Sequence, residues 1–228
     1  MKLLRPDLFD LNPHRKIHTE RIGEGRHNLV IIDDLFLHPR DISNLFNELI
    51  YTDDEQIRLA APTYRSAMLF PNRDQIYREV FEQHFKVYQI KLFSAQSYAS
   101  PPGFDQYFDQ SPIIKPVSYA PHVDLAENSS YAFVIYMNEK NLHGGTQFLR
   151  HTINGAETST GSDEVFQQDT TIRFATPWDY EPLEWQRYHL APMRFNRLVS
   201  YRNNLIHGIY TNGSFYRNTP RKTIVSNF

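Results

Sequence analysis

The chain of 228 residues contains no cysteine, which excludes disulfide bonds and thiolate metal ligands. It also lacks an apolar run of about eighteen residues, the length that a membrane helix needs. Charged residues interrupt the apolar N-terminus too early for a signal peptide. Since 24 basic residues are offset by 26 acidic ones, no excess of charge favours nucleic acid or an anionic membrane as a partner. We therefore expect a cytoplasmic protein that binds neither.

Hydrophobic residues make up 40% of the chain and aromatic residues 14%, and this balance is typical of a β-rich protein with a sizeable core. The length predicts one domain over residues 1–228. In the second half, Gly, Pro and Asn separate short alternating or apolar runs, which predict strands. These runs lie at residues 89–93, 131–137, 147–149, 171–174, 197–201 and 223–225.

The first 87 residues have a different pattern. Residues 1–28 are polar with scattered Pro and Gly and predict an irregular segment, and the apolar residues 29–32 then predict a short buried strand. Asp41 or Ser43 is a suitable cap for a helix whose apolar residues recur at helical spacing, and a second helix is expected to open at residues 72–74. The predicted fold is mainly β with flanking helices: strand and supporting helices over 1–87, and a jelly-roll core (a double-stranded β-helix, cupin-like) over 88–228.

His122 and Asp124 are the residues that carry most chemical information. On a strand, residues i and i+2 point to the same face, so this pair can offer an imidazole nitrogen and a carboxylate oxygen to one ion. His207 is a third candidate ligand. Two histidines and one carboxylate on one face of an octahedron suit non-haem Fe(II) and leave three positions open. Taken alone, the pair also fits a surface turn after Pro121, and His207 also fits a core histidine bound to a backbone carbonyl.

The order of motifs along the chain favours the metal site. His122 and Asp124 are followed by Gly144-Gly145-Thr146, then Arg197-Leu-Val-Ser-Tyr201, then His207-Gly208, then Arg221-Lys-Thr223. This order, over roughly residues 90–228, resembles the Fe(II)- and 2-oxoglutarate-dependent dioxygenases, in the prolyl-hydroxylase-like branch. The resemblance implies a hydroxylase that uses Fe(II), 2-oxoglutarate and O2, in which His122, Asp124 and His207 hold the iron and form the catalytic centre. Related halogenases carry a small residue at the position of Asp124, so its presence favours hydroxylation.

Three cations, Arg217, Arg221 and Lys222, follow His207, and in the family such a residue binds the far carboxylate of 2-oxoglutarate. Arginine has the planar fork that matches a carboxylate, which favours it over lysine. Arg217 lies among turn residues, whereas Arg221 begins the last predicted strand. Period-two alternation places Arg221 and Thr223 on one face and Lys222 on the other. We therefore expect Arg221 and Thr223 to bind the co-substrate.

Two tyrosines, Tyr98 and Tyr119, are further candidates, since each could reach a bound oxoacid through its hydroxyl or simply pack; we include Tyr119 in the predicted co-substrate site. His143 precedes paired glycines that allow a close backbone approach, so we interpret it as a neighbour of the site and not as a ligand. Residues 154–170 are the most loop-like stretch and predict a mobile insertion beside the site.

The expected substrate is a small molecule, an amino acid or a peptide, and the sequence does not determine the oligomeric state. A serine hydrolase is disfavoured, because the chain has no Gly-x-Ser-x-Gly motif. A cupin-type metal enzyme, or a binding protein that does not use 2-oxoglutarate, would explain His122, Asp124 and His207. It would leave Arg221 and Thr223 without a role.

Overall fold

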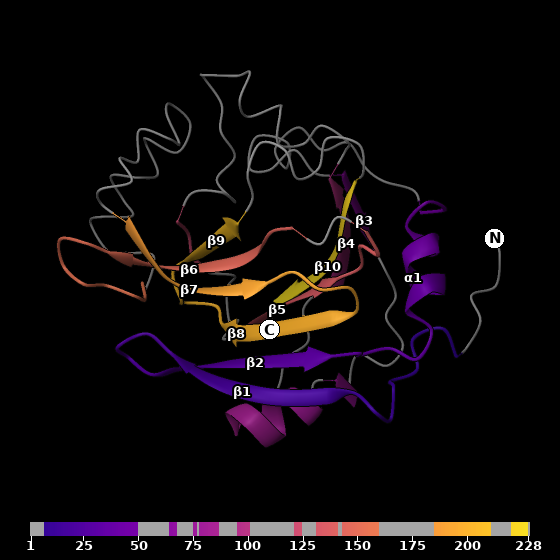
Figure 1. Cartoon of the computed structure of the whole chain (residues 1–228), viewed down its shortest axis with the longest axis horizontal. Coiled ribbons are helices and arrows are strands. Elements are labelled where there is room, and N and C mark those ends of the chain that lie inside the picture. The colour runs from indigo at the N-terminus through magenta and orange to yellow at the C-terminus, as the bar shows by residue number, and fades with distance from the viewer. Residues whose placement is uncertain are drawn as a thin grey trace, which may run out of the picture.

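Two antiparallel sheets form the protein in the computed structural model (Figure 1). The structure describes residues 7–49, 64–67, 75–76, 78–86, 95–100, 121–124, 131–140, 143–159, 185–210 and 220–227. The elements are β1 (Lys16–Ile22), β2 (His27–Asp33), α1 (Pro39–Leu45), β3 (Tyr64–Ala67), η1 (Arg78–Phe85), β4 (Ala95–Ser100), β5 (Tyr131–Tyr136), β6 (Gly145–His151), β7 (Trp185–Pro192), β8 (Arg197–Arg202), β9 (His207–Tyr210) and β10 (Arg221–Asn227).

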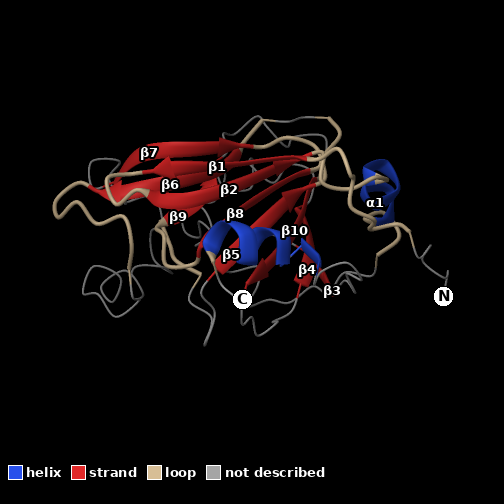
Figure 2. Cartoon of the chain, turned by 90° about the horizontal axis from the view of Figure 1, so that it is seen from below, coloured by secondary structure: helices blue, strands red, loops and turns tan. Residues whose placement is uncertain are grey.

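The larger sheet has the strand order β1-β2-β8-β5-β10-β4-β3, and the smaller sheet has the order β7-β6-β9. Neighbours in these sheets are far apart in the sequence: β10, the last strand, lies between β5 and β4. Figure 2 shows the strands from below, with α1 at the edge of the molecule. The prediction of a mainly β, jelly-roll fold is confirmed. The larger sheet also includes β1, β2 and β3, which come before residue 88.

Each face of the larger sheet covers its own hydrophobic core. Successive side chains of a strand point to opposite faces, and β5 shows this alternation. Phe133 and Ile135 join a cluster that includes Ile42 of α1 and Val80 of η1. Val134 and Tyr136 join a second cluster, which includes residues of the smaller sheet. The chemistry described below lies on this second, inner face.

A buried ion pair fixes the end of β2 against β8. Arg197 donates from Nε to Asp33 Oδ1 over 2.5 Å and from Nη2 to Asp33 Oδ2 over 2.8 Å, and Arg194 approaches the same carboxylate. Burial opposes ionisation of Asp33, but the hydrogen bond and charge of Arg197, with Arg194 and His18, lower its pKa overall. The register of the central strands therefore depends partly on a desolvated charge pair.

Two predictions for the N-terminal part are wrong. Residues 1–28 are not irregular throughout, because β1 pairs with β2 along its whole length. This strand lies at the edge of the sheet and exposes charged side chains, so it has no apolar alternation to reveal it. The first helix begins at Pro39 and not at Asp41 or Ser43, since proline is well suited to a first helical turn, and Ser43 is buried within the helix.

Other strand predictions are confirmed within β2, β5, β6, β8 and β10, whereas β7 and β9 were not predicted. The predicted second helix corresponds in part to residues 75–76 and to η1, which is wound as a π-helix. The strands predicted at 89–93 and 171–174, and the helix start at 72–74, lie outside the described residues. Within the described part of the chain, no helix has the length and apolar character needed to cross a membrane.

Candidate metal centre

His122, Asp124 and His207 lie together on the inner side of the larger sheet. One ligand atom from each lies within 4.8 Å of the others, and no other group of three His, Asp or Glu residues in the described ranges has this geometry. Asp124 Oδ2 is 3.3 Å from His207 Nε2, and Asp124 Oδ1 is 3.7 Å from His122 Nε2. The structure therefore brings together the three residues that the sequence selected as metal ligands.

Backbone pairing sets the positions of these side chains. His122 and His207 form an isolated antiparallel bridge, with both N–H···O distances at 2.9 Å. On its other side, β9 pairs with β6, where His207 lies opposite Phe148. The Asp124 N–H donates to the Asn203 carbonyl over 2.9 Å, and Asn203 Nδ2 donates to the Asp124 carbonyl over 3.2 Å. Each ligand thus belongs to a segment that main-chain hydrogen bonds hold in place.

His207 presents one defined nitrogen to the centre. Its Nδ1 lies 2.8 Å from the Leu205 carbonyl, which can only accept, so Nδ1 carries the proton and Nε2 is left to face Asp124. The ring packs edge-on to Tyr201, with the two centroids 4.8 Å apart, and Tyr201 packs in turn on Phe148. His207 is 4% exposed, so neighbouring side chains fix its orientation as well as its tautomer.

The carboxylate is ionised over the physiological range. Burial favours the neutral acid, but the charge and hydrogen bond of His207, with the charge of His122, lower the pKa of Asp124 to about 2. Conversely, burial lowers the pKa of His207, while Asp124 and the Leu205 carbonyl raise it and prevail. Attraction between these groups is therefore strong, and a divalent cation would meet a carboxylate that is already deprotonated.

A buried polar group lies on the neighbouring strands. Arg221 is 5% exposed and Thr223 is 1% exposed. The Arg221 guanidinium lies 5.8 Å from the centre of the Tyr136 ring, and the Tyr136 hydroxyl hydrogen-bonds Thr146 Oγ1 over 2.7 Å. Thr223 and Tyr136 are directly opposite each other in the β5–β10 register. Arg221 Nε is buried and has no hydrogen-bond partner among the described residues, so this group has a donor available for a ligand.

Lys222 lies on the opposite face of β10, as the alternation predicts. Its Nζ donates to the Ser43 carbonyl over 2.8 Å and lies over the Phe46 ring, at the helical side of the larger sheet. Of the other predicted co-substrate residues, Tyr119 lies outside the described residues, as does Arg217. For Tyr98 only the backbone is described, and it pairs with Thr223.

Four residues near the centre were given no role from the sequence: Tyr136, Thr146, Tyr201 and Asn203. Tyr136 and Tyr201 lie in apolar strand segments, Thr146 follows the paired glycines, and Asn203 belongs to no motif. The burial of a hydroxyl against an arginine is a property of the folded chain. Burial raises the pKa of Tyr136, against the opposing effects of Arg221 and Thr146, so its hydroxyl stays protonated and can donate.

The paired glycines serve a close backbone approach. Gly144 and Gly145 have φ values of 106° and 153°, and a Cβ at Gly145 would lie 2.2 Å from the Ala191 carbonyl oxygen. His143 is exposed and does not belong to the metal-binding group. The close approach of Gly145 to the Ala191 carbonyl explains the paired glycines without a ligand role for His143.

Residues 154–159, the described part of the predicted mobile insertion over residues 154–170, form no helix or strand but are anchored to the rest of the chain. Glu157 is 6% exposed and accepts hydrogen bonds from the backbone N–H groups of Glu24 and Gly25, both at 3.0 Å, and from Arg150. Thr158 forms a bridge with Leu205. These contacts join the segment to the β1–β2 turn and to the chain that precedes His207. Residues 160–170 lie outside the described residues.

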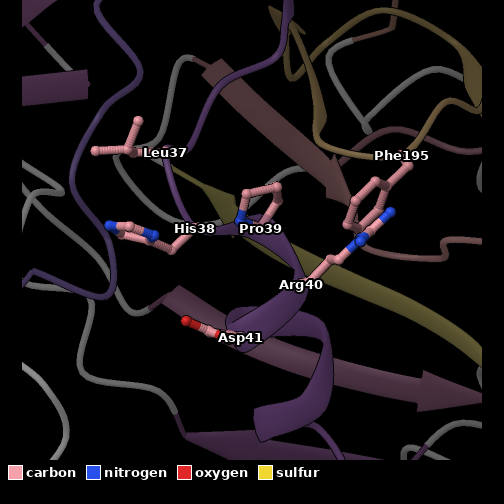
Figure 3. Close-up of a pocket in the computed structure, with 6 residues that line it drawn as sticks. All are labelled: Leu37, His38, Pro39, Arg40, Asp41 and Phe195. Carbon is pink, nitrogen blue, oxygen red and sulfur yellow. The ribbon is translucent and has the colours of Figure 1, made fainter.

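A separate hollow of about 300 Å³ lies beside α1 (Figure 3). Leu37 and His38 lie on one side of it, and Arg40 and Phe195 on the other. Arg40 is largely exposed and lies 3.4 Å from Glu139. This hollow contains none of the metal-binding group, and we assign no chemistry to it.

Comparisons with known proteins support the fold. The family model described as "Family of unknown function (DUF6445)" matches residues 13–218. No curated protein matches the sequence. Among solved structures, HygX from Streptomyces hygroscopicus, with nickel and 2-oxoglutarate bound, has a TM-score of 0.50 at 9% identity, over 88% of this chain and 82% of that one. A Pseudomonas putida prolyl-4-hydroxylase has a TM-score of 0.46 at 12% identity, over 90% and 93%. At such identity the likeness to HygX shows a shared fold.

Proposed function

Since the chain belongs to DUF6445, a family of unknown function, we propose its activity from the geometry of its own residues. We infer that it is a non-haem Fe(II)- and 2-oxoglutarate-dependent oxygenase that hydroxylates a small molecule, an amino acid or a peptide. The observation that carries this proposal is the convergence of His122, Asp124 and His207 beside a buried arginine with an available donor.

The donor set fits Fe(II). Two imidazole nitrogens and one carboxylate oxygen are the ligands of the facial triad, which leaves positions open for substrates. The Leu205 carbonyl fixes the His207 tautomer with Nε2 available, and Asn203 holds the Asp124 backbone. Partners of this kind orient metal ligands and typically affect metal affinity 10- to 100-fold, by rough estimate. His122, Asp124 and His207 are thus the proposed metal ligands and catalytic centre.

Arg221 and Thr223 are the proposed anchor for the far carboxylate of 2-oxoglutarate. A guanidinium matches a carboxylate with two parallel hydrogen bonds, and burial strengthens the pair. Tyr136 lies beside Arg221 and opposite Thr223, so its hydroxyl is a further donor for the same carboxylate. Tyr119 remains a proposed member of this site on sequence grounds. Bound Fe(II), with 2-oxoglutarate as the source of electrons, would supply the activation of O2.

The protein's own contribution is to position these groups and exclude water. Tyr201 and Phe148 cover the His207 ring, and the inner hydrophobic cluster continues on to Val134 and Val199. Apolar walls of this kind limit side reactions while the metal and co-substrate carry the demanding chemistry. The balanced charge of the chain supports a small-molecule, amino-acid or peptide substrate in preference to nucleic acid.

A cupin-type metal enzyme or a binding protein without 2-oxoglutarate is the second candidate, since the metal-binding group alone would serve it equally well. The burial of Arg221 next to Tyr136 and Thr223 favours the oxygenase, because a buried guanidinium without an acidic partner is costly unless a ligand pairs with it. No ion pair links Arg221 to another residue in the described ranges.

The test combines metal binding with turnover. Purified protein should bind one Fe(II) and convert 2-oxoglutarate to succinate in an O2-dependent reaction. His207→Ala and His122→Ala should reduce Fe(II) affinity more than about 100-fold, beyond the effect of an outer partner, and abolish succinate release. His143→Ala is the matched control, since it removes an exposed histidine nearby and should behave like the wild type. Metal binding without 2-oxoglutarate binding would favour the cupin alternative. If His207→Ala keeps both its Fe(II) affinity and its succinate release, the assignment of the metal ligands is wrong.

A further inference from the structure

A second hollow lies on the outer face of the larger sheet, near the turn between β1 and β2. Its volume is about 210 Å³. Positively charged and aromatic side chains dominate its walls, and none of the described residues that line it is Asp or Glu. The lining residues that matter here are Arg21, Arg26, His27, Phe85, Tyr131 and Arg202.

The arginines of this hollow have charge available for a ligand. Arg21, Arg26 and Arg202 are exposed and form no ion pair with any residue in the described ranges. Arg21 Nη1 donates to the Arg26 carbonyl over 3.1 Å, which ties the Arg21 side chain to the backbone of the turn. In a chain of net charge −2, three arginines with no acidic partner in the described part form a local concentration of positive charge.

Glu157, the carboxylate that contacts His27, is already bound by other groups. Glu157 Oε2 lies 3.2 Å from His27 Nε2, and Arg150 pairs with the same carboxylate. Arg150 and two backbone N–H groups already bind Glu157. The charge of Glu157 is therefore compensated by other donors, and no described residue supplies a counter-charge to Arg26 or Arg202.

Two aromatic rings, those of Phe85 and Tyr131, also line the hollow. The Phe85 ring of η1 lies 4.5 Å from the Tyr131 ring, centroid to centroid, and the Arg202 guanidinium lies 5.8 Å from the centre of Tyr131. The cation–π contact keeps the Arg202 side chain near the ring. A ligand in the hollow would thus meet both guanidinium donors and aromatic rings.

The hollow is separate from the metal centre. Tyr201 points to the inner face and packs on His207, whereas the next residue, Arg202, lies over Tyr131. Tyr131 and Phe85 belong to the outer hydrophobic cluster, and Tyr201 belongs to the inner one. The larger sheet therefore stands between this hollow and His207.

We propose that the hollow binds a small organic oxyanion, a phosphate or carboxylate carried on a planar ring. Guanidinium groups match both oxyanions through paired hydrogen bonds. The ring of the ligand would pack against Phe85. Arg202 precedes Asn203, whose carbonyl accepts the hydrogen bond from the Asp124 backbone N–H. The hollow is therefore one residue along the chain from a residue that positions a proposed metal ligand.

Calorimetric titration of the full chain with phenyl phosphate, benzoate and inorganic phosphate tests the proposal. The aromatic anions should bind more tightly than inorganic phosphate, and comparison of phenyl phosphate with benzoate decides which oxyanion is preferred. Arg26→Gln combined with Arg202→Gln should weaken binding at least about tenfold, because it removes charge-assisted hydrogen bonds. Arg40→Gln combined with Arg187→Gln removes two exposed arginines elsewhere and should leave affinity unchanged.

Phe85→Leu separates the role of the ring from that of the charge. This variant should lose the preference for phenyl phosphate over inorganic phosphate while it still binds the latter. Arg221→Leu should bind phenyl phosphate like the wild type, which distinguishes this hollow from the proposed 2-oxoglutarate site whether or not that site is correct. Absence of binding in the wild type, or equal weakening in the Arg40/Arg187 control, would overturn the proposal.

Discussion

Arg221 lies with its guanidinium 5.8 Å from the centre of the Tyr136 ring, on the inner face of the larger sheet. The two residues come from adjacent strands, β10 and β5, and Tyr136 is fully buried. A cation at this depth normally has a charged partner. Its Nε has none in the described part of the chain. This relationship is the basis of the first two predictions.

Arg221→Leu should weaken 2-oxoglutarate binding and leave Fe(II) binding nearly intact, since the lost contact is a charge pair at the far end of the co-substrate. Loss of one partner of a desolvated pair costs roughly 2–5 kcal/mol, which corresponds to about thirtyfold to several thousandfold in affinity. Titration of the Fe(II) protein with 2-oxoglutarate in the absence of O2 measures the change. Lys222→Leu, on the opposite face of β10, is the control and should bind 2-oxoglutarate like the wild type. If Arg217→Leu loses 2-oxoglutarate affinity while Arg221→Leu keeps it, the anchor has been assigned to the wrong arginine.

Tyr136→Phe should lower the affinity for 2-oxoglutarate about fivefold, as expected for one hydrogen bond worth roughly 1 kcal/mol. Thr146→Val removes the other end of the 2.7 Å hydrogen bond and leaves the Tyr136 hydroxyl buried. A double-mutant cycle on 2-oxoglutarate affinity should show coupling between the two changes, because residues in one hydrogen-bond network do not act additively. Strict additivity would mean that the pair has a packing role only.

Asp33→Asn should reduce the free energy of unfolding by roughly 3 kcal/mol at pH 7, since it leaves Arg197 buried without its carboxylate. The pKa of Asp33 is lowered in the folded protein, so its stabilising contribution is present above the pKa of the unfolded chain. That contribution is lost as the pH falls through the lower, folded value. Urea unfolding from pH 7 to pH 3 should show the difference between the wild type and the variant shrink below about pH 4.

The control for that experiment is Lys16→Gln. Lys16 pairs with Asp34 at 3.6 Å, but both side chains are largely exposed, at 72% and 41%. An exposed ion pair contributes about 0–1 kcal/mol. If Lys16→Gln destabilises as much as Asp33→Asn, the effect reflects overall charge and not the buried pair.

Gly145→Ala should destabilise the protein by roughly 3 kcal/mol, because a Cβ would lie 2.2 Å from the Ala191 carbonyl oxygen and β6 and β7 would have to separate. Gly155→Ala offers a matched comparison: φ is +73°, but no atom lies within 4 Å of its Cβ. Gly155→Ala should cost only about 1–2 kcal/mol, because an alanine is strained at a positive φ but meets no steric clash there. Equal losses in chemical unfolding would contradict the steric explanation.

The sequence by itself determined the fold class and three residues that come together. Short apolar runs indicate β5, β8 and β10, because a strand buried on both faces needs apolar side chains on each of them. Within β10, the period of two places Lys222 away from Arg221, which is a local property of a single strand. His122 and Asp124 come together as expected, although His122 forms only an isolated bridge and Asp124 lies outside the strands.

Only the tertiary structure decided what surrounds those residues. The edge strand β1 is largely exposed to solvent, so its sequence has no apolar alternation that would predict a strand. Its extended conformation is stabilised by hydrogen bonding to β2 along its whole length. Tyr136 and Thr146 belong to different sheets, and no sequence pattern encodes a hydroxyl pair formed by packing one sheet on another. Glu157 likewise becomes an anchor only because the β1–β2 turn folds onto it. Contacts between distant segments depend on how the whole core packs, and one-dimensional periodicity does not contain that information.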